Sequence, residues 1–71
     1  MIMIERIAAT ADNFNKADNK SKKAAYYNQL QGMLLVLATM DVDIQFVFTE
    51  DRKIAKIISR TSSSSAECDV I

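Results

Sequence analysis

The segment from Ser21 to Met40, SKKAAYYNQLQGMLLVLATM, constrains the fold more than any other, because it is the longest apolar and helix-favouring stretch of the chain. Its apolar residues recur at steps of four and three, the spacing that lines one face of an α-helix: Tyr26, Leu30, Met33, Leu37 and Met40. From 33 to 38 the sequence reads MLLVLA, so apolar side chains point away from that face as well. A helix that is apolar on all sides has to be covered on all sides. We therefore predict a central helix over 21–40 whose second apolar face meets another copy of the protein.

The length of the chain supports the same expectation. With 71 residues it forms one small domain, of a size at which a single hydrophobic core is marginal and disulfides, metals or oligomers add stability. One cysteine cannot form an internal disulfide, and a chain without histidine lacks the usual zinc ligands. Oligomerisation remains, and we predict a homo-oligomer. The expected interface residues are Leu30, Met33, Leu34 and Leu37.

A shorter amphipathic helix is predicted before the central one, from Met3 to about Asn15. Its apolar positions have helical spacing: Ile4, Ile7, Ala11 and Phe14. The following stretch, NFNKADNKS, is rich in residues that cap helices and form turns, with Asp18 or Ser21 as the expected N-cap of the central helix. Since no glycine or proline enforces this break, one continuous long helix stays open as the alternative.

After Met40 the apolar period changes from helical to alternating. The segment 43–49, DIQFVFT, has every second residue apolar and large, which predicts a strand with one buried face. The β-branched segment 54–59, IAKIIS, predicts a second strand, joined to the first by a polar turn of about four residues, 50–53. Asp41 and Asp43 end the helix, and without further oxygen ligands they do not form a cation site. The expected fold class is α+β, with two helices and a two-stranded antiparallel hairpin.

The last segment, 61–71, begins with a serine run and is predicted to be a flexible tail outside the domain of residues 1–60. Cys68 stands four residues from the end, the position of a prenylation box, but Asp69 does not suit such a box and no strong basic run precedes it. A short strand formed by the final residues and docked on the body is the alternative.

Charge and composition exclude several classes of function. Nine basic residues balance nine acidic ones, so no net charge draws the chain to nucleic acid or to an anionic membrane. The central apolar run is shorter than the ~18 residues that a bilayer requires. The opening MIMI is followed at once by Glu5 and Arg6, so we expect no signal peptide and a cytoplasmic protein. With no histidine, one tail cysteine and one glycine inside a helix, we expect no enzyme, cofactor or metal.

The best candidate for binding is the start of the central helix. Lys16, Lys20, Lys22 and Lys23 cluster there, although a helix N-terminus favours acidic side chains. Phosphates or an acidic partner would compensate for these charges. Nearby aromatic and amide side chains offer stacking and hydrogen bonds, and the hairpin turn adds two cations. The predicted binding residues are Lys20, Lys23, Tyr26, Tyr27, Asn28, Gln31, Arg52 and Lys53.

One stretch resembles a known kind of protein. The run YYNQLQGMLLVLATMDVDIQFVF, followed by a charged turn and IAKII, is similar to small phage and prophage proteins in which a Tyr-Tyr-x-x-Leu-x-Gly-x-Leu helix leads into a short hairpin. The resemblance covers Tyr26 to Ile58, and Arg52 replaces the usual glycine of the turn. It implies an accessory protein of a mobile element. Such proteins often inhibit a host defence or regulatory factor by binding it, and some small oligomers sequester nucleotide signals between subunits.

Two functions are therefore expected. The first is a homo-oligomeric binding protein that blocks a host protein or captures a small nucleotide-like anion. The alternative is a DNA-binding transcriptional regulator that uses the region from Lys16 to Lys23, although the chain lacks net positive charge and a clear recognition helix.

Overall fold

Two helices and a three-stranded antiparallel sheet make up residues 3–71, the part of the chain that the computed structural model describes. In chain order the elements are α1 (Met3–Lys16), α2 (Lys20–Ala38), β1 (Asp43–Phe48), β2 (Ile54–Arg60) and β3 (Ser65–Asp69). The predicted α+β class is confirmed. The sheet has three strands, in the order β1-β2-β3, where the sequence predicted two.

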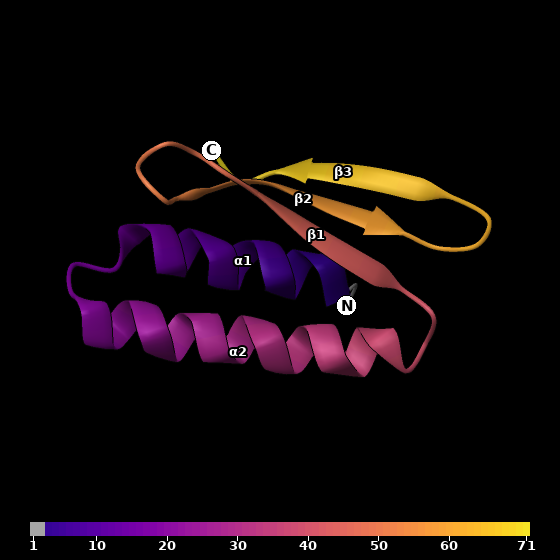
Figure 1. Cartoon of the computed structure of the whole chain (residues 1–71), viewed down its shortest axis with the longest axis horizontal. Coiled ribbons are helices and arrows are strands. Elements are labelled where there is room, and N and C mark those ends of the chain that lie inside the picture. The colour runs from indigo at the N-terminus through magenta and orange to yellow at the C-terminus, as the bar shows by residue number, and fades with distance from the viewer. Residues whose placement is uncertain (1–2) are drawn as a thin grey trace.

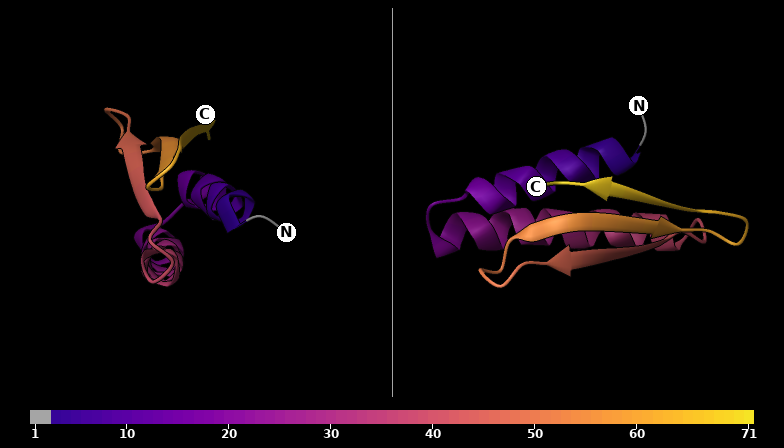
Figure 2. Two further views of the ribbon diagram at one scale, coloured as in Figure 1. Left: turned by 90° about the vertical axis from the view of Figure 1, so that its right-hand side faces the viewer. Right: turned by 90° about the horizontal axis from the view of Figure 1, so that it is seen from above.

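The helices form one layer and the sheet forms the other. Figure 1 shows α1 and α2 side by side and antiparallel, with the sheet above them. The end-on view in Figure 2 places α1 beneath the sheet and α2 farther from it, on the side of β1. Accordingly α1 contacts both α2 and β2, while α2 also contacts β1. No helix among residues 3–71 is both long and apolar enough to cross a bilayer.

Asn19 separates the two helices. Its backbone is extended, with φ −147°, and its side chain accepts a hydrogen bond of 2.8 Å from the backbone N–H of Lys22. This satisfies one of the unpaired donors in the first turn of α2. The N-cap is therefore Asn19, and the prediction of Asp18 or Ser21 was wrong by one or two residues. The alternative of one continuous helix is wrong as well, because α2 starts anew at its capping asparagine even though no glycine or proline interrupts the chain there.

At its other end, α2 finishes in a left-handed turn. The N–H of Val42 donates to Leu37 O at 3.1 Å, and the N–H of Asp41 donates to Ala38 O at 3.2 Å. These bonds satisfy carbonyls that the helix leaves unpaired, and they require a left-handed residue at Asp41, whose φ is 58°. A glycine usually occupies this position because a side chain there costs energy.

Replacing Asp41 by glycine is expected to raise the free energy of unfolding by about 1 kcal/mol, through relief of backbone strain and loss of a negative charge at a helix C-terminus. Urea denaturation of the variant checks this. Asp43→Gly is the matched control, because it removes a nearby carboxylate from a strand residue whose φ is not positive, and it should destabilise. A stabilisation of equal size in both variants would contradict the strain explanation.

The core lies between the helix layer and the sheet. It contains Ile7 and Ala11 of α1, Leu30 and Leu37 of α2, and Ile54 and Ile57 of β2. Leu30 is 0% exposed and Leu37 is buried, so two of the four predicted interface residues pack inside their own chain. Met33 and Leu34 are half-buried, and Met33 packs against the core. The large apolar side chains exposed at this end of the helix are others: Leu35 and Val36 of α2, and Met40 just beyond it, which are 70%, 50% and 65% exposed.

The β1–β2 hairpin has an irregular register and a tight loop. Val47 pairs with Lys56 and Phe48 pairs with Ile54, so Ala55 is an extra residue on β2. The N–H of Thr49 donates to Lys53 O at 2.8 Å, which closes a loop of three residues, 50–52, one fewer than predicted. The last loop residue of such hairpins is usually left-handed. Here it is Arg52, with φ 65°.

The predicted flexible tail supplies β3, and the fold prediction was wrong on this point. The serine run forms a turn, in which the N–H of Thr61 donates to Ser64 O at 2.8 Å and the Thr61 hydroxyl accepts from the Ser64 N–H. Beyond the turn, Cys68 is half-buried opposite Ile57. Lys56 on the other face of the sheet lies 3.9 Å from Glu67. Small apolar and acidic residues alternate over 65–69, and this alternation lets the segment pair with β2. From the sequence, a docked strand of the final residues was expected only as the alternative.

One asparagine joins α1 to the sheet. The side chain of Asn15 donates to Ile54 O at 2.8 Å and accepts from the Ile54 N–H at 2.7 Å. The last paired residue of β3, Asp69, lies opposite Lys56, so β3 provides no partner at Ile54. The amide of Asn15 therefore replaces a neighbouring strand at this point. The bond pair links residues 39 positions apart in the sequence.

Candidate functional site

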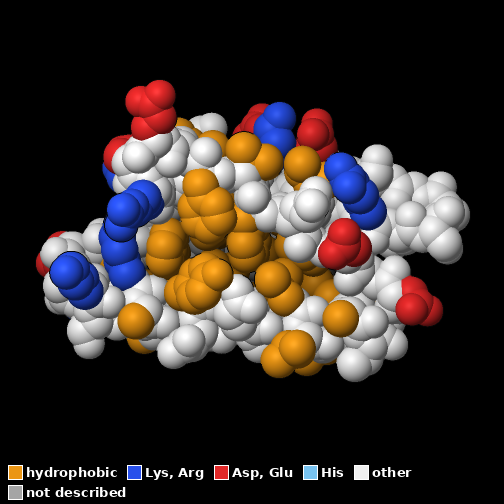
Figure 3. Space-filling model, in the orientation of Figure 1, with side chains coloured by type: hydrophobic (Ala, Val, Ile, Leu, Met, Phe, Trp, Pro, Cys, Tyr) orange, Lys and Arg blue, Asp and Glu red, His pale blue; other side chains and the backbone are white. Residues whose placement is uncertain are grey.

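A pocket lies where the end of α1, the start of α2 and the β1–β2 loop meet. Its volume is about 400 Å³. Six residues line it, and we call it the basic–aromatic pocket: Phe14, Lys20, Lys23, Ala24, Tyr27 and Arg52. In Figure 3 the blue lysine and arginine side chains at the left end of the molecule mark this region. The pocket brings the loop residue Arg52 to two helices that lie more than two dozen residues before it in the sequence.

Local structure places each of these side chains. Lys20, Lys23, Ala24 and Tyr27 are spaced by three, one and three residues, which puts them on one side of α2. Phe14 belongs to the last turn of α1, and the antiparallel helix pair brings it beside α2. Arg52 comes from the left-handed position of the hairpin loop. A glycine there would relieve the backbone but would carry no guanidinium into the pocket.

Two aromatic rings form the apolar part of the pocket. The ring centroids of Phe14 and Tyr27 are 6.1 Å apart, with the planes inclined by 45°. The Nζ of Lys23 lies 5.4 Å from the centroid of Phe14, within the range of a cation–π contact. This contact holds the ammonium of Lys23 at the pocket.

The positive charge of the pocket is not neutralised by close ion pairs. Among residues 3–71, no carboxylate lies within 4.0 Å of the charged groups of Lys20, Lys23 or Arg52. Asp51 lies next to Arg52 in the loop, and its pKa is lowered mainly by a hydrogen bond from the Thr49 hydroxyl and further by Lys53 and Lys23. Asp51 accepts a hydrogen bond from Thr49 and lies 4.0 Å from Lys53, and it forms no close ion pair with the three pocket cations.

The structure brings together four of the eight predicted binding residues: Lys20, Lys23, Tyr27 and Arg52. The other four lie outside this pocket. Asn28 and Gln31 are exposed on α2 and do not line it, and Lys53 faces Asp51. Tyr26 lines a different pocket from Tyr27, since adjacent helix positions do not share a face. The sequence also missed Phe14 and Ala24, since Phe14 was assigned to the apolar face of α1 and only helix packing places it here.

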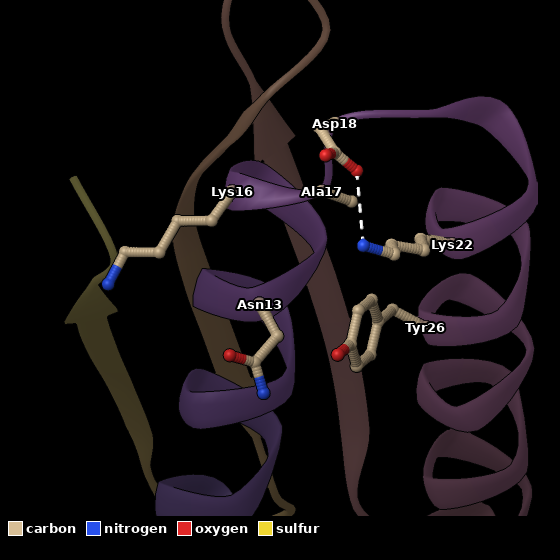
Figure 4. A pocket seen from close by; sticks show the side chains of 6 residues that line it. All are labelled: Asn13, Lys16, Ala17, Asp18, Lys22 and Tyr26. Carbon is tan, nitrogen blue, oxygen red and sulfur yellow. Dashed lines mark ion pairs between the residues drawn. The ribbon is translucent and has the colours of Figure 1, made fainter.

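Tyr26 belongs to a second pocket, shown in Figure 4, with a volume of about 220 Å³. It is lined by Asn13, Lys16, Ala17, Asp18, Lys22 and Tyr26. Here the lysines are paired: Lys22 lies 3.3 Å from Asp18, and Lys16 lies 2.9 Å from Asp12. Figure 4 shows the ring of Tyr26 between the two helices, with Lys16 extending away. The lysine cluster is therefore divided between two sides of the helix pair.

A third cavity, of about 230 Å³, lies at the opposite end of the molecule. Its lining contains no charged side chain: Ile4, Leu37, Val42, Ile44, Ser59, Thr61 and Ala66. Residues 3–71 contain no group of three or more histidine, cysteine or acidic side chains arranged to hold a metal ion. The basic–aromatic pocket is thus the best candidate for ligand binding.

The chain was compared with family models, curated proteins and solved structures. None of the three comparisons gave a match.

Proposed function

We propose that this chain is a small non-enzymatic binding protein whose basic–aromatic pocket takes a nucleotide-like ligand, a planar ring that carries phosphate. The observation that carries the proposal is the meeting of Lys20, Lys23 and Arg52 beside the rings of Phe14 and Tyr27. Aromatic faces stack on planar rings, and arginine and lysine bind phosphate oxygens through charge-assisted hydrogen bonds. The volume of about 400 Å³ is within the range of small-molecule sites.

The chemistry of the lining supports binding without catalysis. The basic–aromatic pocket contains no carboxylate, thiol or imidazole that would act as a general base or nucleophile. In the setting that the sequence resemblance implies, a phage or mobile-element accessory protein in the host cytoplasm, such a pocket would sequester a nucleotide signal. Inhibition of a host protein that presents a phosphate or an acidic side chain to the same pocket is the other form of this proposal.

DNA binding has less support. A regulator that uses Lys16 to Lys23 would present these lysines together to the phosphate backbone. Lys16 and Lys22 are instead paired with acidic residues on one side of the helix pair, while Lys20 and Lys23 line the pocket on the other. The zero net charge adds no long-range attraction.

Titration with the four ribonucleoside 5′-monophosphates, followed by amide chemical shifts and calorimetry, tests the proposal. At least one nucleotide should bind at millimolar concentration or below, with shifts centred on Lys20, Lys23, Tyr27 and the 50–53 loop. The free nucleoside and inorganic phosphate should each bind more weakly than the nucleotide, because each uses only half of the pocket. The absence of binding by all four nucleotides would overturn the proposal.

Two matched pairs of variants identify the site. Arg52→Gly removes the guanidinium and should lower the affinity about tenfold. Because glycine also relieves the left-handed backbone at this position, the loss will not arise from unfolding. Lys53→Ala, next to it but outside the lining, should leave affinity unchanged. Tyr27→Leu should weaken binding, whereas Tyr26→Leu should not, because these neighbouring tyrosines line different pockets. Equal losses within either pair would contradict the assignment.

A further inference from the structure

The residues that line the basic–aromatic pocket follow a fixed order along α2. Tyr27, Lys23 and Lys20 are spaced by four and three residues, so they lie on one face of the helix. At about 1.5 Å per residue, Lys20 is about 10 Å from Tyr27 along the helix axis, with Lys23 between them. The ring of Phe14 lies beside Tyr27, with the centroids 6.1 Å apart. The pocket thus has an aromatic end, followed by two cationic positions one helical turn apart.

The hairpin loop approaches this row beside Lys23. Figure 1 shows the loop between β1 and β2 at the end of the molecule where α2 begins. The pKa of Asp51 in this loop is lowered mainly by a hydrogen bond from Thr49. Lys53 and Lys23 lower that pKa further, so Lys23 lies within electrostatic reach of the loop. Arg52, the next loop residue, therefore adds its charge to the cationic position nearer to the rings.

The acidic residues around the pocket do not line it. Asp18 lies 3.3 Å from Lys22, and Asp51 lies 4.0 Å from Lys53, so each of these carboxylates faces a lysine outside the lining. Glu50 is exposed in the loop and is not part of the lining either. The lining itself therefore carries three positive charges and no negative one.

A single phosphate does not match this row of charges. A phosphate monoester carries about two negative charges at neutral pH, whereas the lining has three cations. With the ring of the ligand at Phe14 and Tyr27, its first phosphate meets Lys23 before Lys20, which lies one turn farther from the rings. The cation left without a full partner is therefore Lys20. A second phosphate would extend towards it, in the direction of the positive end of the helix dipole.

We infer that the pocket takes a nucleotide with a chain of at least two phosphates, such as a nucleoside 5′-diphosphate. The first phosphate binds at Lys23 and Arg52, and the second binds at Lys20. This inference rests on the proposed function and narrows the ligand class of the same pocket. Lys20 is then the residue that determines the preference for a diphosphate. Because Lys20 is exposed, its ion pair contributes modestly, and the expected preference is about fivefold.

The test compares ligands that differ in the number and position of phosphates. Each of the four ribonucleosides is titrated as its 5′-monophosphate, its 5′-diphosphate and its 3′,5′-bisphosphate, at constant ionic strength. The 5′-diphosphate should bind about fivefold more tightly than the other two forms of the same nucleoside, because only its phosphates form a chain. A 5′-diphosphate that binds no more tightly than the 5′-monophosphate or the 3′,5′-bisphosphate overturns the inference and leaves the proposed function standing. If none of these ligands binds, both are overturned.

Three variants assign the preference to a residue. Lys20→Gln should reduce the preference for the diphosphate to less than about twofold, because it removes the partner of the second phosphate. Lys23→Gln should weaken both ligands and keep the preference. Lys22→Gln is the matched control, since Lys22 belongs to the same first turns but faces Asp18 outside the lining, and it should change neither affinity. All three lysines are exposed or half-buried, and circular dichroism checks that each variant is folded. A preference that survives Lys20→Gln, or that Lys22→Gln abolishes equally, contradicts the inference.

Discussion

Replacing Leu30 by alanine is expected to lower the free energy of unfolding by about 3 kcal/mol and the melting temperature by about 15 °C. Leu30 is 0% exposed and belongs to a core of only a few residues between α1, α2 and β2. A deletion of three carbons there loses transfer free energy and leaves a cavity. Since small domains are stable by about 5 kcal/mol, more than half of the stability would be lost. Chemical denaturation at fixed protein concentration measures the change.

Leu35→Ala is the matched control for this prediction. It makes the same chemical change on the same helix, five residues further on, at a side chain that is 70% exposed. Its effect on stability should remain within about 0.5 kcal/mol. Similar losses at Leu30 and Leu35 would show that α2 is also covered on its outer face, as the all-round apolar sequence by itself suggested.

Replacing Asn15 by alanine is expected to cost about 2 kcal/mol, because it leaves the buried N–H and C=O of Ile54 without the partners that Asn15 provides. The variant Asn15→Asp should be pH-dependent. At neutral pH the new carboxylate accepts from the Ile54 N–H but repels Ile54 O, so its pKa should be raised in the folded state. Protonation restores a donor, and stability relative to the wild type should therefore rise as the pH falls towards about 4. Denaturation at several pH values checks both variants.

Asn13→Ala provides the comparison, since Asn13 is an exposed asparagine on the same helix. It should change stability little at any pH. If Asn15→Ala were equally neutral, or if Asn15→Asp showed no pH dependence beyond that of the wild type, the link from α1 to β2 would not contribute to the fold.

The elements and the site differ in how far the sequence predicts them. Both helices and the first strand follow from apolar periodicity, and the second strand follows from its β-branched residues; both are local properties of the sequence. Strand β3 was missed because a serine run outweighed the short alternation after it, and its order depends on pairing with β2. Within the site, Lys20, Lys23 and Tyr27 follow from helical spacing. Their meeting with Phe14 and Arg52 depends on how α1 and the loop pack against α2.

By itself the sequence determined the α+β class and the helix-to-hairpin order, because these depend on propensity and period within short windows. It also excluded a disulfide-stabilised or zinc-stabilised fold, since one cysteine and no histidine cannot supply either. Only the tertiary structure decided which apolar residues are core and which are surface: Leu30 is buried and Leu35 is exposed, although both are leucines of the same helix. The physical reason is that burial is a relation between elements. The packing of α1 and the sheet selects one face of α2, and the same packing brings separate cations and rings into one pocket.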